Sequence, residues 1–91
     1  MGMAYMPNQT ILEEPKKLMR FVLTDGESFA RCAVTGKALL AAAGLANASA
    51  EELKEIFLTH LPKIQRVAER KYEAGQCEET GTFLVRASDL R

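Results

Sequence analysis

Apolar and polar side chains alternate from Leu18 to Thr35, and this period of two predicts a pair of adjacent strands. The pair Asp25-Gly26 interrupts the alternation and readily supplies the positive φ angles that a tight hairpin turn needs. One face of this hairpin is therefore expected to point into a core, with Met19, Phe21, Leu23, Ala30, Cys32 and Val34.

After Ser49 the apolar positions recur every three or four residues, which predicts a long amphipathic helix that ends at Gly75. It begins with a capping box, in which the Ser49 hydroxyl accepts from the Glu52 N–H and the Glu52 carboxylate accepts from the Ser49 N–H. Pro62 lacks an N–H group, so we expect a kink or break near residues 59–61. The apolar stripe consists of Leu53, Ile56, Phe57, His60 or Leu61, Ile64, Ala68 and Tyr72.

Two further elements complete the predicted fold. Thr35 can cap a short helix from Gly36 to about Ala43, and Gly81 to Leu90 is predicted as a last strand. The order strand, strand, helix, helix, strand predicts a two-layer α+β domain. Its small antiparallel or mixed sheet, with the hairpin first and a lone strand last, is covered on one face by the short helix and the long proline-kinked helix.

The N-terminal residues 1–17 form no clear periodic pattern, because prolines and charged pairs interrupt their apolar residues. We expect a flexible tail there, or a weak edge strand around residues 10–12. Residues 18–91 then form a single α+β domain, since a chain of 91 residues that is 47% apolar and 26% charged supports one core.

Charge and targeting signals narrow the class of protein. Twelve basic and twelve acidic residues give a formal net charge of zero, which offers no long-range attraction to a polyanion or a membrane. The N-terminus lacks the basic region and apolar core of a secretory signal, and no apolar run is long enough to cross a membrane. We expect a cytoplasmic protein with two free thiols, Cys32 and Cys77.

The sheet face that points away from the helices is a candidate interaction surface. Its candidate residues are Val22, Phe29, Arg31, Leu84 and Arg86, and Arg20 lies among them. Apolar groups on an open sheet face, unpaired sheet edges and zero net charge all favour a homodimer or an unidentified protein partner. A monomer is the competing expectation, because the arginines resist desolvation unless they find partners.

A second set of residues is basic and lies late in the long helix: Lys63, Arg66, Arg70 and Lys71. Acidic residues occupy the first turns of the same helix, so this order complements the helix macrodipole and is typical of a solvated surface. The alternative is that the four residues form a patch that contacts nucleic acid.

No set of residues suggests catalysis or metal binding. His60 is the only imidazole, and we expect a structural role in which a ring N–H bonds a carbonyl released by Pro62. Cys32 and Cys77 lie far apart in sequence and lack the close spacing of zinc ligands, and the acidic neighbours of Cys77 disfavour a thiolate. We therefore expect no enzyme, no cofactor and no metal.

A set of short motifs runs from the second strand to the end of the chain. They are Gly36-Lys37-Ala38-Leu39 after the strand with Cys32, Phe57-x-x-His60, Ile64, Ala68-x-x-Lys71-Tyr72, Gly75, and Phe83-Leu84-Val85 before Asp89-Leu90. Over residues 18–91 this set resembles a small bacterial family known as domain of unknown function 1488. The resemblance implies a compact cytoplasmic α+β domain and carries no established activity, cofactor or catalytic residue. Members of that family often have an arginine where Leu61 stands and an acidic residue where Gln65 stands.

These observations favour a small non-enzymatic protein-interaction or accessory module. The alternative is a nucleic-acid-associated regulator that uses the basic patch of the long helix.

Overall fold

The predicted hairpin forms the centre of the sheet in the computed structural model, which describes residues 3–14 and 17–90. Strands β3 (Leu18–Thr24) and β4 (Phe29–Thr35) pair in antiparallel fashion along their whole length. Gly26 adopts a φ of 98°, which an L side chain rarely adopts. The Asp25 carboxylate accepts the N–H groups of Ser28 and Glu27 at 2.7 and 2.9 Å, and these bonds lower the pKa of Asp25.

The N-terminal segment adds two short strands to the outer side of β3. β1 (Ala4–Tyr5) pairs with the end of β3, and β2 (Ile11–Glu13) pairs with its beginning. A 3₁₀ turn, η1 (Pro7–Gln9), separates them. The segment therefore forms an interrupted edge strand. The sequence leaves two alternatives open, a flexible tail and a weak edge strand. The part of that expectation that concerns residues 1, 2, 15 and 16 lies outside the described residues.

The last strand is shorter than the sequence predicts. β5 (Phe83–Val85) pairs in parallel with β4, and the chain then turns into a 3₁₀ helix, η2 (Ala87–Leu90). The prediction of a strand up to Leu90 is wrong because Asp89 closes a turn. Its carboxylate accepts the Arg86 N–H at 2.9 Å, and its own N–H donates to the Arg86 carbonyl at 2.9 Å.

The structure has three helices, because the long predicted helix is divided in two at His60, within the predicted region of a kink or break. They are α1 (Gly36–Ala43), α2 (Ala50–Thr59) and α3 (Leu61–Ala74). The capping box of α2 is present, with the Glu52 N–H 3.2 Å from the Ser49 hydroxyl and the Ser49 N–H 3.0 Å from the Glu52 carboxylate. His60 separates α2 from α3, and Pro62 lies in the first turn of α3, where its missing N–H costs no hydrogen bond.

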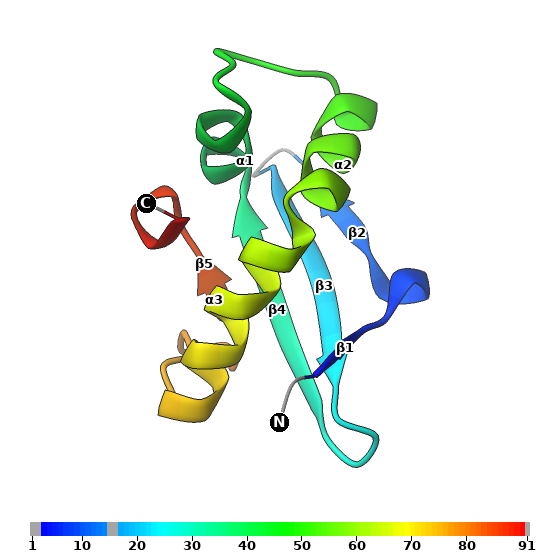
Figure 1. The fold of residues 1–91 in the computed structure, drawn as a ribbon, viewed down its shortest axis with the longest axis vertical. Coiled ribbons are helices and arrows are strands. Elements are labelled where there is room, and N and C mark those ends of the chain that lie inside the picture. The colour runs from blue at the N-terminus through cyan, green and yellow to red at the C-terminus, as the bar shows by residue number, and fades with distance from the viewer. Residues whose placement is uncertain (1–2, 15–16, 91) are drawn as a thin grey trace.

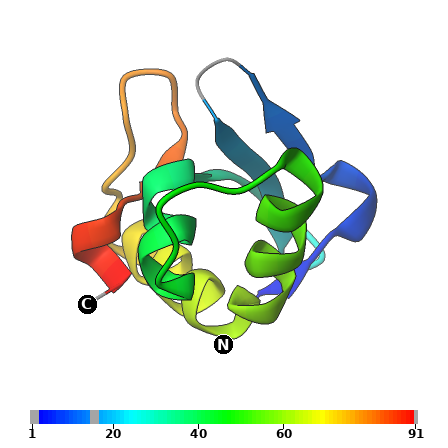
Figure 2. The ribbon, with the colours of Figure 1, turned by 90° about the horizontal axis from the view of Figure 1, so that it is seen from above.

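All three helices lie on one face of the mixed sheet, as Figures 1 and 2 show, so the predicted two-layer α+β fold is confirmed. The core between the layers contains Phe21 from β3 and Phe57 from α2, whose ring centres are 5.2 Å apart. Tyr5 from β1 packs edge-on against Phe57 at 5.7 Å. The N-terminal segment therefore contributes to the core as well as to the sheet.

Candidate interaction surface

The sheet face without helices, which we call the open face, exposes several large apolar side chains. Phe29 on β4 and Ile11 on β2 are 64% and 63% exposed, and Val22 and Leu84 are half-buried. The alternation of the strands places these residues here, because each lies one position from a residue that points into the core. Exposed apolar side chains on a sheet face that no helix covers make this face a candidate binding surface.

The strand register brings one arginine beside the exposed phenylalanine. Arg31 lies opposite Val22, and Phe29 is two residues away on the same strand and face. These three residues line a shallow hollow of about 300 Å³, together with Met6 and Gln9 from the N-terminal segment. The open face therefore has an apolar depression with a guanidinium at its side.

The arginines predicted for this face differ in their partners. Arg20 forms an ion pair with Glu13 of β2, and Arg86, just after β5, pairs with Glu78 at 3.1 Å. Within residues 3–14 and 17–90, the Arg31 side chain has no ion-pair or hydrogen-bond partner. Arg31 is thus the cation of this surface that is available to another molecule.

The sequence placed Val22, Phe29, Arg31 and Leu84 together, and the structure brings them to one face. Ile11 was not among the predicted residues of this face. A weak edge strand around residues 10–12 was one of two expectations, but a segment without clear alternation does not show which face its side chains occupy. The apolar pair Ile11-Leu12 was the one available signal.

The predicted basic patch of α3 is smaller than the sequence suggests. Lys63, Arg66 and Arg70 are exposed, whereas Lys71 reaches the Asp89 carboxylate of η2 at 3.2 Å. Partial burial raises the pKa of Asp89, but the Arg86 N–H and the Lys71 ammonium outweigh this effect, so the pKa is lowered below 3.8. Lys71 is therefore already paired with a carboxylate of the chain, whereas the other three residues of the predicted patch form no ion pair with a described residue.

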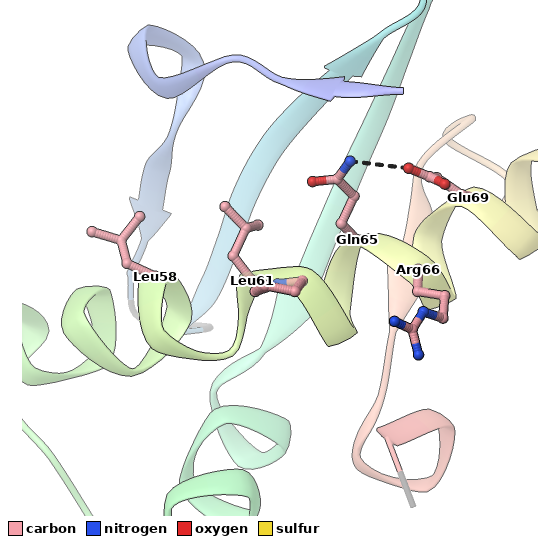
Figure 3. A pocket seen from close by; sticks show the side chains of 6 residues that line it. Leu58, Leu61, Gln65, Arg66 and Glu69 are labelled. Atoms are coloured by element: carbon pink, nitrogen blue, oxygen red, sulfur yellow. Dashed lines mark hydrogen bonds between the residues drawn. The ribbon is translucent and has the colours of Figure 1, made fainter. Parts of the chain in front are cut away.

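A larger hollow, of about 490 Å³, runs along the α2–α3 junction (Figure 3). Leu58 and Leu61 line one end of it, and Gln65, Glu69 and Arg66 line the other. In Figure 3 Gln65 points toward β1, and its amide donates to the Glu69 carboxylate at 3.0 Å.

The polar groups of this hollow hold the N-terminal segment. The Met3 N–H donates to Glu69 at 3.1 Å, and the Gln65 amide donates to the Met3 carbonyl. We call these two bonds the Met3 clasp. Gln65 and Glu69 thus have a structural role. They provide hydrogen-bond partners for the Met3 backbone groups, which would otherwise need another partner such as a neighbouring strand.

The remaining candidates for chemistry do not converge in the described part of the chain. No group of three or more histidine, cysteine or acidic residues lies close enough there to hold a metal ion. His60 is half-buried, and its ring makes no hydrogen bond with a described residue, so the expected bond to a released carbonyl is not found. Cys32 and Cys77 are both free, and burial raises the pKa of the Cys32 thiol to about 12. No described helix has the length and apolar content to cross a bilayer.

The fold and the open face define a class of protein, a small two-layer α+β domain whose mixed sheet is covered on one side. A family model described as "Protein of unknown function (DUF1488)" matches residues 7–85, and the chain belongs to this family. The predicted resemblance is therefore confirmed, although the match begins earlier and ends earlier than residues 18–91.

A solved structure has the same fold. It is the crystal structure of a protein of unknown function from the DUF1488 family of Shewanella loihica PV-4, with a TM-score of 0.81 and 17% sequence identity. The alignment covers 92% of this chain and 91% of that one. A search of curated proteins gave no match.

Proposed function

We propose that this chain is a non-enzymatic protein-interaction module of the bacterial cytoplasm and that the open face is its binding surface. The observation that carries this proposal is the position of Phe29, largely exposed beside Arg31, whose side chain has no partner among the described residues. Aromatic and arginine side chains contribute much of the energy of protein interfaces. Arg20 and Arg86 already have carboxylate partners. The desolvation cost of covering this face with a partner is therefore lower than it would be if all three arginines were unpaired.

The occupant that fits this face best is a second copy of the chain. A standard interface takes about 800 Å² from each partner, and the accessible surface of this chain is 5900 Å² in total. The open face of the sheet can supply the buried area that such an interface takes from each partner. A formal net charge of zero means that two copies do not repel each other at long range.

Sedimentation velocity at micromolar concentrations tests the dimer. We expect a mass of twice 10.0 kDa for the wild-type chain and a monomer for Phe29→Ser. Leu58→Ser is the matched control, because Leu58 is 49% exposed on the helical side and its replacement should leave the dimer intact. A wild-type monomer at every concentration would exclude the second copy, and equal behaviour of the two variants would place the interface elsewhere.

The alternative function, a nucleic-acid-associated regulator, is supported by one observation. Lys63, Arg66 and Arg70 recur at helical spacing, are exposed and have no ion-pair partner in the described ranges. Fluorescence anisotropy with labelled duplex DNA and single-stranded RNA tests it. Binding that weakens steeply with salt, and that is lost when all three are replaced by Gln, would favour this function over the first.

A further inference from the structure

A hollow of about 350 Å³ lies in the helical layer, between α1, the start of α3 and η2. We propose that it is a binding site for a small aliphatic carboxylate, such as a short-chain fatty acid. The site is separate from the open face, because its lining residues come from α1, the start of α3 and η2, and Figure 1 shows α1 and α3 on the covered side of the sheet. The proposal therefore does not depend on the proposed function.

The walls of the hollow are mostly apolar. Ala38, Ala41 and Ala42 of α1 line one side, and Ala87 and Leu90 of η2 line another. Ala38 and Leu90 are themselves buried, at 0% and 7% exposure, so they form a fixed floor. The volume is within the range of known ligand pockets, which are typically apolar with a few polar groups.

The polar groups of the hollow are nitrogen donors. His60, just before α3, and Lys63, in its first turn, line the hollow, and neither side chain makes a hydrogen bond or an ion pair with any residue that the structure describes. Asp89 belongs to η2 but is not among the lining residues, and its carboxylate is paired with Lys71. Glu52 and Glu55 line a separate groove on another side of His60. Among the described residues that line the hollow there is therefore a cationic group and no carboxylate.

An apolar floor beside two nitrogen donors fits one class of ligand. A carboxylate can accept one hydrogen bond from the Lys63 ammonium and one from the His60 ring, and such charge-assisted bonds are the strong ones. The short alkyl chain can then lie on the alanine side chains, where it leaves water. A phosphate without an alkyl chain would leave the apolar floor uncovered.

The single histidine of the chain makes the test direct, because its ring protons are unique in a one-dimensional ¹H NMR spectrum. We would titrate the full chain with sodium hexanoate at fixed pH near 6 and constant ionic strength. The ring signals should shift and saturate, with a midpoint of about 1–10 mM, which is the range of a small ligand with few contacts. Hexanol, sodium acetate and inorganic phosphate serve as parallel probes, and each should bind at least about tenfold more weakly.

Two variants decide whether Lys63 holds the carboxylate. Lys63→Gln should raise the midpoint for hexanoate about tenfold, because a charge-assisted bond is lost. Arg70→Gln is the matched control, an exposed cation of the same helix outside the hollow, and its midpoint should equal that of the wild type. A shift that never saturates, equal binding of hexanol or phosphate, or an unchanged midpoint in Lys63→Gln would overturn the proposal.

Discussion

The two faces of the sheet use similar side chains in very different surroundings. Phe21 is 1% exposed on the helix-covered face, whereas Phe29 is 64% exposed on the open face of the same hairpin. Both follow from the alternation of β3 and β4, so the residue type does not explain the difference. The helices do, because they pack on one face and leave the other to water or to a partner. The covered face therefore stabilises the fold, and the open face is available for binding.

The largest expected effect comes from a matched pair of phenylalanines. Phe57→Ala should lower the free energy of unfolding by about 3–5 kcal/mol, because it removes a fully buried ring that contacts Phe21 and Tyr5. Phe29→Ala should change it by less than about 0.5 kcal/mol in the monomer. Urea denaturation at low protein concentration measures both. Equal losses would mean that the two faces do not differ in their contribution to stability.

The Met3 clasp affects both faces of the sheet, because the N-terminal segment that it holds adds Tyr5 to the core and Ile11 to the open face. Glu69→Ala should cost about 1–2 kcal/mol, because it leaves the Met3 N–H without its partner. Glu73→Ala is the control, an exposed acidic residue of the same helix. Hydrogen exchange of the β1 and β2 amides should rise in the first variant alone. Unchanged exchange there would show that the segment is held without the clasp.

A smaller loss of stability is expected from a change at the start of α2, one of the helices on the covered face. Ser49→Ala removes the capping bond to the Glu52 N–H and should cost about 1 kcal/mol. Ser28→Ala in the hairpin turn is a suitable comparison, because the Ser28 side chain makes no hydrogen bond with a described residue. A thermal melt compares the two variants. If both melt at the wild-type temperature, the capping box does not contribute to stability.

The smallest effect concerns the pH dependence of the ion pair between Lys71 and Asp89. The pKa of Asp89 is lower in the folded chain than its ordinary value of 3.8. Its ionised form therefore stabilises the fold above that value, and this contribution is lost as the pH falls through the folded pKa. We expect Asp89→Asn to lose less than about 1 kcal/mol near pH 7 and to differ less from the wild type near pH 3. Urea denaturation at the two pH values checks this difference. A gap that widens at low pH would contradict the assigned direction.

The sequence by itself determined the local elements of this protein. The alternation in β3 and β4, the caps of α1 and α2 and the break before Pro62 were all predicted, because each depends on residues within about four positions of one another. The α+β class and four residues of the open face followed from the same alternation. Local periodicity is enough for these features, since it sets which side of an element is apolar.

Only the tertiary structure decided the rest. The N-terminal segment has little pattern of its own, and it joins the sheet by pairing with β3, while Met3 bonds Gln65 and Glu69, which lie more than sixty residues away along the chain. Lys71 leaves the basic patch because the turn at Asp89 brings a carboxylate to it. The hollow beside His60 exists because α1, α3 and η2 meet there. Each feature joins distant parts of the chain, and no local rule of spacing records such a contact.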